Sequence, residues 1–98
     1  MTINKTLNGT TLTVALEGRL DTTTAPELEA ELKQSLSGVT ELIMNFEKLD
    51  YISSAGLRVL LRAQKKMAAC GRMKLINVSP IIMEIFEITG FSDILTVE

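Results

Sequence analysis

The chain has 98 residues, a mass of 10.8 kDa and a net charge of −2, so we expect residues 1–98 to form one small domain. Hydrophobic residues make up 46% of the sequence and charged residues 22%, as in globular proteins and unlike disordered or fibrous ones. Histidine is absent and Cys70 is the single cysteine, which excludes histidine acid–base chemistry, an internal disulfide bond and most zinc sites.

The start of the chain, Met1–Lys5, lacks the apolar core of a secretion signal. No apolar run approaches the roughly 20 residues that cross a bilayer, so we expect a cytoplasmic protein with no membrane partner. Charge is unevenly distributed, because the segment from Tyr51 to Met83 carries six basic residues and no acidic ones. This segment is either a solvated surface or a binding surface. The pI of about 5.1 and the four aromatic residues speak against nucleic acid as a partner.

The first elements in chain order are predicted to be two strands and a helix. Residues 3–7 and 12–16 flank Asn8-Gly9, a pair that favours a tight turn, and predict a β-hairpin. Gly18-Arg19-Leu20-Asp21 is then expected to lead the chain out of the sheet. Thr24–Glu27 has the form of a capping box, and leucines at 28, 32 and 36 have helical spacing. We expect this helix to end at Gly38 and to carry an ion pair between Glu29 and Lys33.

The second half of the chain alternates between strands and helices. The apolar run 42–46 predicts a strand that is covered on both faces. A helix is expected from the serine pair at 53 and 54 to Gly71, a strand at 73–78, a helix from Ser79-Pro80 to Gly90, and a last strand at 94–97.

The predicted order is β-β-α-β-α-β-α-β, which indicates an α/β fold. We expect a mixed, mostly parallel sheet of four to five strands with an N-terminal hairpin and about three helices. In such sheets the functional site lies beyond the carboxyl ends of the strands. Two loops qualify, Gly18–Thr24 and Glu47–Ser54.

The segment Leu49–Leu57 brings two hydroxyl groups to the start of a helix, where free backbone N–H groups favour negative charge. A phosphoryl group on Ser54 would be stabilised there, and Arg58 lies one turn further on. Gly56 would let another part of the backbone approach closely. The alternative is structural: Ser53 or Ser54 is a helix cap, and Asp21 and Asp50 are turn formers.

Other constellations of residues do not support catalysis. The serine pair has no histidine and no lysine within one turn, so a serine nucleophile would lack a base. Glutamates at 27, 29 and 31 do not converge on a metal, and Gly56 is isolated from other glycines. Cys70 is expected to be an inert core residue. We therefore expect a non-enzyme without a metal or cofactor. An enzyme that uses Asp21 and Ser54 is the least favoured alternative.

At three motifs the chain resembles the STAS-domain family, in particular the small bacterial anti-sigma factor antagonists. The motifs are Gly18-Arg19-Leu20-Asp21 after the hairpin, Leu49–Leu57 at the signature loop, and Val78-Ser79-Pro80 followed by Phe86 and Gly90-Phe91. They occur in the family's order, and the match covers essentially the whole chain.

The resemblance implies a switch. An unphosphorylated antagonist binds an anti-sigma factor, which releases a sigma factor. The anti-sigma factor is commonly also a serine kinase, and it phosphorylates the antagonist at the position of Ser54. A serine phosphatase reverses the modification. Asp21, Asp50, Ser53, Ser54, Gly56, Leu57 and Arg58 are then expected to form the partner-binding surface.

Two positions depart from the family pattern. Ser53 stands where many members have Asp, which makes Ser53 a rival acceptor, and Ala55 stands where many have Ser or Thr. The alternative function is a constitutive STAS scaffold in a transporter or another signalling complex, without phosphoryl transfer.

Overall fold

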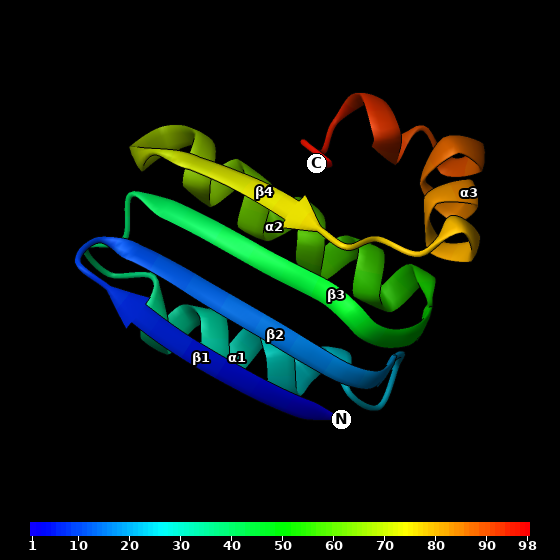
Figure 1. Cartoon of the computed structure of the whole chain (residues 1–98), viewed down its shortest axis with the longest axis horizontal. Helices are drawn as coiled ribbons and strands as arrows, with labels where there is room; N and C mark the ends of the chain where they lie inside the picture. The colour runs from blue at the N-terminus through cyan, green and yellow to red at the C-terminus, as the bar shows by residue number, and fades with distance from the viewer.

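The computed structural model describes residues 1–98 and consists of one sheet with helices packed on it (Figure 1). In chain order the elements are β1 (Thr2–Asn8), β2 (Thr11–Leu20), α1 (Ala25–Ser35), β3 (Glu41–Ile52), α2 (Ser54–Cys70), β4 (Arg72–Ile76), α3 (Pro80–Thr89) and the 3₁₀ helix η1 (Phe91–Asp93). The strands lie in the order β1-β2-β3-β4. β1 is antiparallel to β2, and the other pairs are parallel. The predicted α/β fold with an N-terminal hairpin is confirmed.

Helices α1 and α2 lie on the same face of the sheet, and α3 lies beyond the end of β4 (Figure 1). Between sheet and helices, 24 buried hydrophobic residues form one continuous core. In β3, Leu42, Met44 and Phe46 are buried, whereas Ile43 and Asn45 are half-buried on the opposite side. The prediction that this strand is covered on both faces is therefore wrong, because both long helices pack on the same face.

The hairpin is confirmed, but its turn lies one residue later than predicted. Asn8 pairs with Thr11, so the two-residue loop is Gly9-Thr10. Gly9 has a φ of +64°, while Asn8 and Thr10 have negative φ. Some two-residue hairpin turns require a positive φ only at the first of the two loop residues. Glycine adopts such a φ most easily, so Gly9 takes this position and the turn shifts by one residue. The Gly18–Asp21 segment was also expected to leave the sheet, yet β2 continues to Leu20.

The start of α1 differs from the predicted capping box. Thr24 occupies the cap position, but its side chain accepts no hydrogen bond from the first turn of the helix. Its hydroxyl is bound to the preceding loop instead. The helix also ends at Ser35, three residues before Gly38, which adopts a φ of +79° in the turn to β3. The hydrogen bonds of Thr24 to the preceding loop thus take the place of the predicted capping hydrogen bond.

The C-terminal region confirms the third helix and corrects the last strand. The Oγ of Ser79 accepts a hydrogen bond from the amide of Ile82 at 3.3 Å, and Gly90 ends α3 with a φ of +80°. Residues 94–97 form no strand, because only Val97 bridges to Leu75 in β4.

Two further observations concern the helices. Cys70 is exposed at the C-terminal end of α2, so the expectation of a core cysteine is wrong. None of the helices combines the length and the hydropathy that spanning a membrane requires.

Candidate functional site

The candidate site lies where the parallel strands β2 and β3 end together. Their pairing shifts between Ala15 and Glu17 and again between Gly18 and Arg19, and β3 contributes an extra residue each time. Such bulges bend and twist a strand locally. As a result, the backbone N–H of Ser53 donates a 2.9 Å hydrogen bond to the carbonyl of Leu20. The loop that begins at Asp21 and the start of α2 are therefore neighbours.

Asp21 organises the first of these loops. Its Oδ1 accepts hydrogen bonds from the amides of Thr23 and Thr24, at 3.0 and 3.1 Å. The Oγ1 of Thr24 accepts from the amide of Asp21 at 2.8 Å and donates to the carbonyl of Arg19 at 2.7 Å. The expected role of Asp21 as a turn former is thus present in the structure, with Thr24 as its partner.

The same hydrogen bonds act on the acidity of Asp21. The hydrogen bond from the amide of Thr24 is the largest effect, and it lowers the pKa of this carboxyl group below its ordinary value of 3.8. Partial desolvation raises the pKa, whereas the Thr23 amide and the Arg19 guanidinium lower it further. Asp21 is therefore an ionised, weakly basic carboxylate at neutral pH. It is suited to hold a loop in place and poorly suited to accept a proton from a serine.

Arg19 and Tyr51 form a pair that the sequence did not reveal. Cζ of Arg19 lies 4.3 Å from the centre of the Tyr51 ring, and its Nε lies 3.6 Å from Oδ2 of Asp21. The tyrosine side chain is 38% exposed. A guanidinium over an aromatic face is attracted by the ring electrons, so the pair presents a partly apolar and cationic surface beside the loop.

The two serines at the start of α2 have different environments. Ser53 is the N-cap residue, but its side chain accepts no hydrogen bond from the helix, and its Oγ is buried without a partner. Ser54 is the first residue of the helix and is exposed. The first amides of a helix have no acceptor within it, and here no side chain caps them. An exposed hydroxyl therefore stands beside uncapped N–H groups.

Other residues of the expected surface are divided between solvent and core. Arg58 is exposed one turn after Ser54 and makes no ion pair, and Asp50 is exposed at the end of β3. Leu57 is only 6% exposed, and Gly56 is buried. In this conformation the last two cannot contact a partner directly, because they lie on the face of α2 that packs on the sheet. Gly56 instead lets α2 approach Leu20 and Ile52 closely, and Leu57 belongs to the hydrophobic core.

The fold is that of a STAS domain. The sequence profile of the STAS domain family matches residues 2–98, and the chain therefore belongs to this family.

The similar relatives include proteins that are named as anti-sigma factor antagonists. BtrV of Bordetella bronchiseptica, a proposed anti-sigma factor antagonist, is 39% identical over 88 residues, which is 88% of this chain and 76% of that protein. The anti-sigma-B factor antagonist of Staphylococcus aureus is 33% identical over 86 residues, which covers 86% of this chain and 80% of that protein.

Solved structures give the same result for the fold. The anti-sigma factor antagonist SpoIIAA of Bacillus, in its unphosphorylated form, superposes with a TM-score of 0.78 at 25% identity, over 99% of this chain and 87% of that one. The phosphorylated form of SpoIIAA superposes with a TM-score of 0.77 at 25% identity, over 99% of this chain and 91% of that one. An antagonist from Mycobacterium paratuberculosis reaches 0.88 over 98% of this chain and 83% of that one, at 18% identity, a likeness of fold alone.

Proposed function

We propose that this chain is an anti-sigma factor antagonist that binds an anti-sigma factor when unphosphorylated and is released from it by phosphorylation of Ser54. The observation that carries the proposal is the exposed Ser54 hydroxyl at the uncapped start of α2. The names of the relatives support the antagonist function. SpoIIAA, which shares the fold, exists in unphosphorylated and phosphorylated forms.

Ser54 is a better acceptor than Ser53 because a kinase must reach the hydroxyl. The Oγ of Ser53 is buried, whereas Ser54 is exposed. In the transfer, the Oγ of Ser54 bonds to the γ-phosphorus of ATP, the bond to the leaving ADP breaks, and the hydroxyl proton passes to a base of the kinase. The lowered pKa of Asp21 makes it a poor base, and we propose that the kinase supplies the catalytic groups.

A phosphate on Ser54 would be held by interactions that this chain already offers. It adds about −1.5 to −2 charges at neutral pH, next to the positive end of a helix of 17 residues. Arg58 lies four residues further on, on the same side of the helix as Ser54. The domain can thus stabilise the anion without refolding. Across a partner interface the same anion must be desolvated, which weakens the complex.

The proposed surface combines the end of β3, the start of α2 and the loop at Asp21. Ser54, Arg58 and Asp50 are exposed around the helix start, while Asp21 fixes the adjacent loop. Arg19 and Tyr51 extend this surface on the side of β2. We propose that the anti-sigma factor, with its serine kinase activity, binds here, and that a serine phosphatase removes the phosphate, in the cytoplasm.

The test is phosphorylation in vitro. The chain is incubated with the anti-sigma factor encoded by the same organism and ATP, and intact mass and peptide mapping locate the phosphate. We expect one phosphate on Ser54, none on the Ser54→Ala variant, and full incorporation on Ser53→Ala. A phosphate on Ser53, or on a serine far from α2, contradicts the proposal. A stable complex without phosphate on any serine would instead support the constitutive scaffold.

A further inference from the structure

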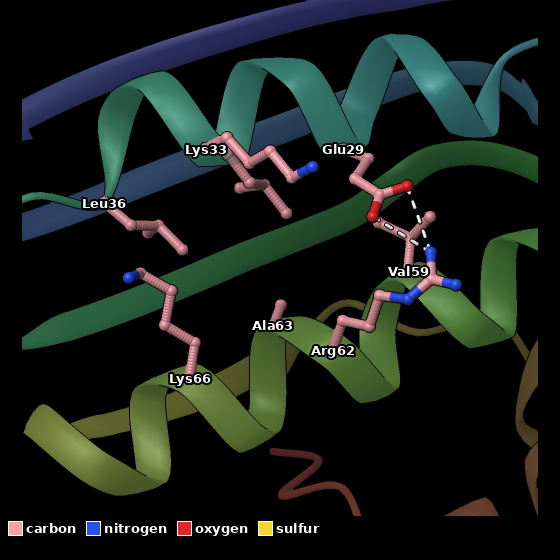
Figure 2. Close-up of a pocket in the computed structure, with 8 residues that line it drawn as sticks. Glu29, Lys33, Leu36, Val59, Arg62, Ala63 and Lys66 are labelled. Atoms are coloured by element: carbon pink, nitrogen blue, oxygen red, sulfur yellow. Dashed lines mark hydrogen bonds and ion pairs between the residues drawn. The ribbon is translucent and has the colours of Figure 1, made fainter.

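A groove lies between α1 and α2, next to the candidate site described above (Figure 2). It encloses about 280 Å³, and its floor consists of four apolar side chains. These are Leu32 and Leu36 from α1 and Val59 and Ala63 from α2. A smaller hollow of about 170 Å³ shares Glu29, Val59 and Arg62 with it and extends the groove to the first turn of α2.

The rim of this groove is cationic. Lys33 of α1 and Arg62 and Lys66 of α2 line the larger hollow, and Arg58 lines the smaller one. Glu29 is the one acidic residue in either lining. Its carboxylate binds Nη1 of Arg62 at 2.9 and 3.1 Å (Figure 2). After this pair is subtracted, three positive charges remain, in a chain whose net charge is −2.

These three charges have no partner within the molecule. Lys33, Arg58 and Lys66 take part in none of the five ion pairs, and all three side chains are exposed. The other acidic residue near the middle of α1, Glu31, is bound by Lys5 of β1 on the opposite flank of the helix. Helix α2 itself contains no acidic residue. The local positive potential is therefore available to a ligand.

We propose that this groove binds an acidic amphipathic helix of a partner protein. An amphipathic helix places apolar side chains at i, i+3, i+4 and i+7 into such a groove, and its flanking carboxylates would meet the cationic rim. Arg58, Arg62 and Lys66 follow each other at intervals of four residues, which spans about 12 Å, or roughly two helical turns. The interaction does not require Ser54. Arg58 is shared with the proposed phosphate site, whereas Lys33 and Lys66 are not, so variants of these two lysines test the groove separately from the proposed switch.

Other anionic partners fit the groove less well. The lining contains no aromatic side chain on which a nucleic acid base could stack. A flat lipid surface would contact the convex outer sides of α1 and α2. It would not reach the apolar residues on the floor of the groove, which are at most 5% exposed. A protruding leucine or isoleucine of a peptide helix can enter this recess.

The test uses a synthetic, fluorescein-labelled peptide of about four helical turns, with leucines in the amphipathic pattern and glutamates beside them. Fluorescence anisotropy measures its binding to the folded chain. Lys65 and Lys66 provide a matched pair of variants, because both are exposed on α2 and only Lys66 lines the groove. We expect Lys66→Glu to weaken binding by about fivefold or more and Lys65→Glu by less than about twofold.

A second variant and control ligands complete the test. Ala63→Leu fills the floor of the groove and should weaken peptide binding without a change in net charge. Lys33→Glu, on α1, should weaken binding to the same extent as Lys66→Glu on α2. Circular dichroism confirms that each variant is folded. Equal effects of Lys65→Glu and Lys66→Glu would overturn the proposal. So would equal binding of a scrambled peptide of the same composition, no binding of the acidic peptide, or a preference for phosphatidylserine vesicles over the peptide.

Discussion

Gly56 in α2 packs directly on Leu20 at the end of β2, and a Cβ atom added to Gly56 would lie 2.7 Å from the Cγ of Leu20. The same Cβ would lie 2.9 Å from Cγ1 of Ile52. Both neighbours are at most 2% exposed and cannot move into solvent. The close packing of the helix start on two strand ends therefore depends on the missing side chain.

The first prediction is that Gly56→Ala lowers the free energy of unfolding by about 1 kcal/mol. Alanine gains about 1 kcal/mol in helix propensity, but overpacking a core costs about 1–3 kcal/mol. Urea unfolding at 25 °C measures the net effect. Ser54→Ala, at an exposed neighbouring position, is the control and should change stability by less than about 0.5 kcal/mol. A more stable Gly56→Ala protein would show that the close contact is relieved without cost.

The second prediction concerns the buried hydroxyl of Ser53. Replacing an N-cap serine normally costs about 1 kcal/mol, but the Oγ of Ser53 makes no hydrogen bond. We expect Ser53→Ala to leave the stability unchanged within about 0.5 kcal/mol or to raise it, because an unpaired buried hydroxyl is removed. Ser79→Ala is the matched control, since the Oγ of Ser79 accepts from Ile82, and it should lose about 1 kcal/mol. Equal losses in the two variants would contradict this reasoning.

The third prediction is a dependence on acid pH. Because the pKa of Asp21 is lower in the folded chain than its ordinary value of 3.8, the unfolded chain binds the proton first as the pH falls. The stabilisation by the Asp21 carboxylate is then complete well above pH 3.8 and is lost as the pH falls through the folded-state pKa.

Asp21→Asn keeps an acceptor oxygen for the amides of Thr23 and Thr24 but has no charge to titrate. Unfolding in urea at a series of pH values should show wild type more stable than this variant at neutral pH, with a gap that narrows below pH 3.8. A gap that stays constant across this range would show that the ionised carboxylate contributes nothing to stability.

The fourth prediction tests the proposed switch by affinity. Ser54→Asp places a permanent negative charge at the start of α2 and should weaken the complex with the anti-sigma factor by about tenfold or more, which corresponds to about 1.4 kcal/mol. Ser54→Ala should bind as wild type does. Isothermal titration calorimetry measures both affinities. Equal affinities of the two variants would rule out a charge-dependent release.

The fifth prediction concerns the ion pair between Glu29 and Arg62. It joins α1 to α2, but the side chain of Arg62 is 60% exposed. We therefore expect a double-mutant cycle with Glu29→Ala and Arg62→Ala to give a coupling of about 0.5 kcal/mol, which decreases in high salt. A coupling that persists unchanged in molar salt would indicate that the pair is effectively shielded from solvent.

Features that depend on a few neighbouring residues were predictable from the sequence. The starts of α2 and α3 follow from Ser54 and from Ser79-Pro80, and Gly90 ends α3. The exposed helix-start serine follows from the same local signals. The helical spacing of the apolar residues in α2 also indicates that Leu57 is buried and Arg58 is exposed. The expected partner surface nevertheless included both residues.

Features that depend on the register between distant segments were not predictable. The contact of Arg19 with Tyr51 exists because β3 contains two extra residues relative to β2. Glu29 was expected to pair with Lys33 within α1, yet it binds Arg62, which lies 33 residues away in sequence. The groove between α1 and α2 arises in the same way, because neither helix alone has both the floor and the rim.

The extra residues of β3 also fix which serine is exposed at the start of α2. Deleting one residue between Phe46 and Ile52, with the strand start and the backbone path held in place, would move each later residue back by one position. Ser54 would then stand where Ser53 stands now, and its hydroxyl would be buried. We expect related STAS domains to vary in the side chains between Phe46 and Ile52 but to keep the number of residues in this segment.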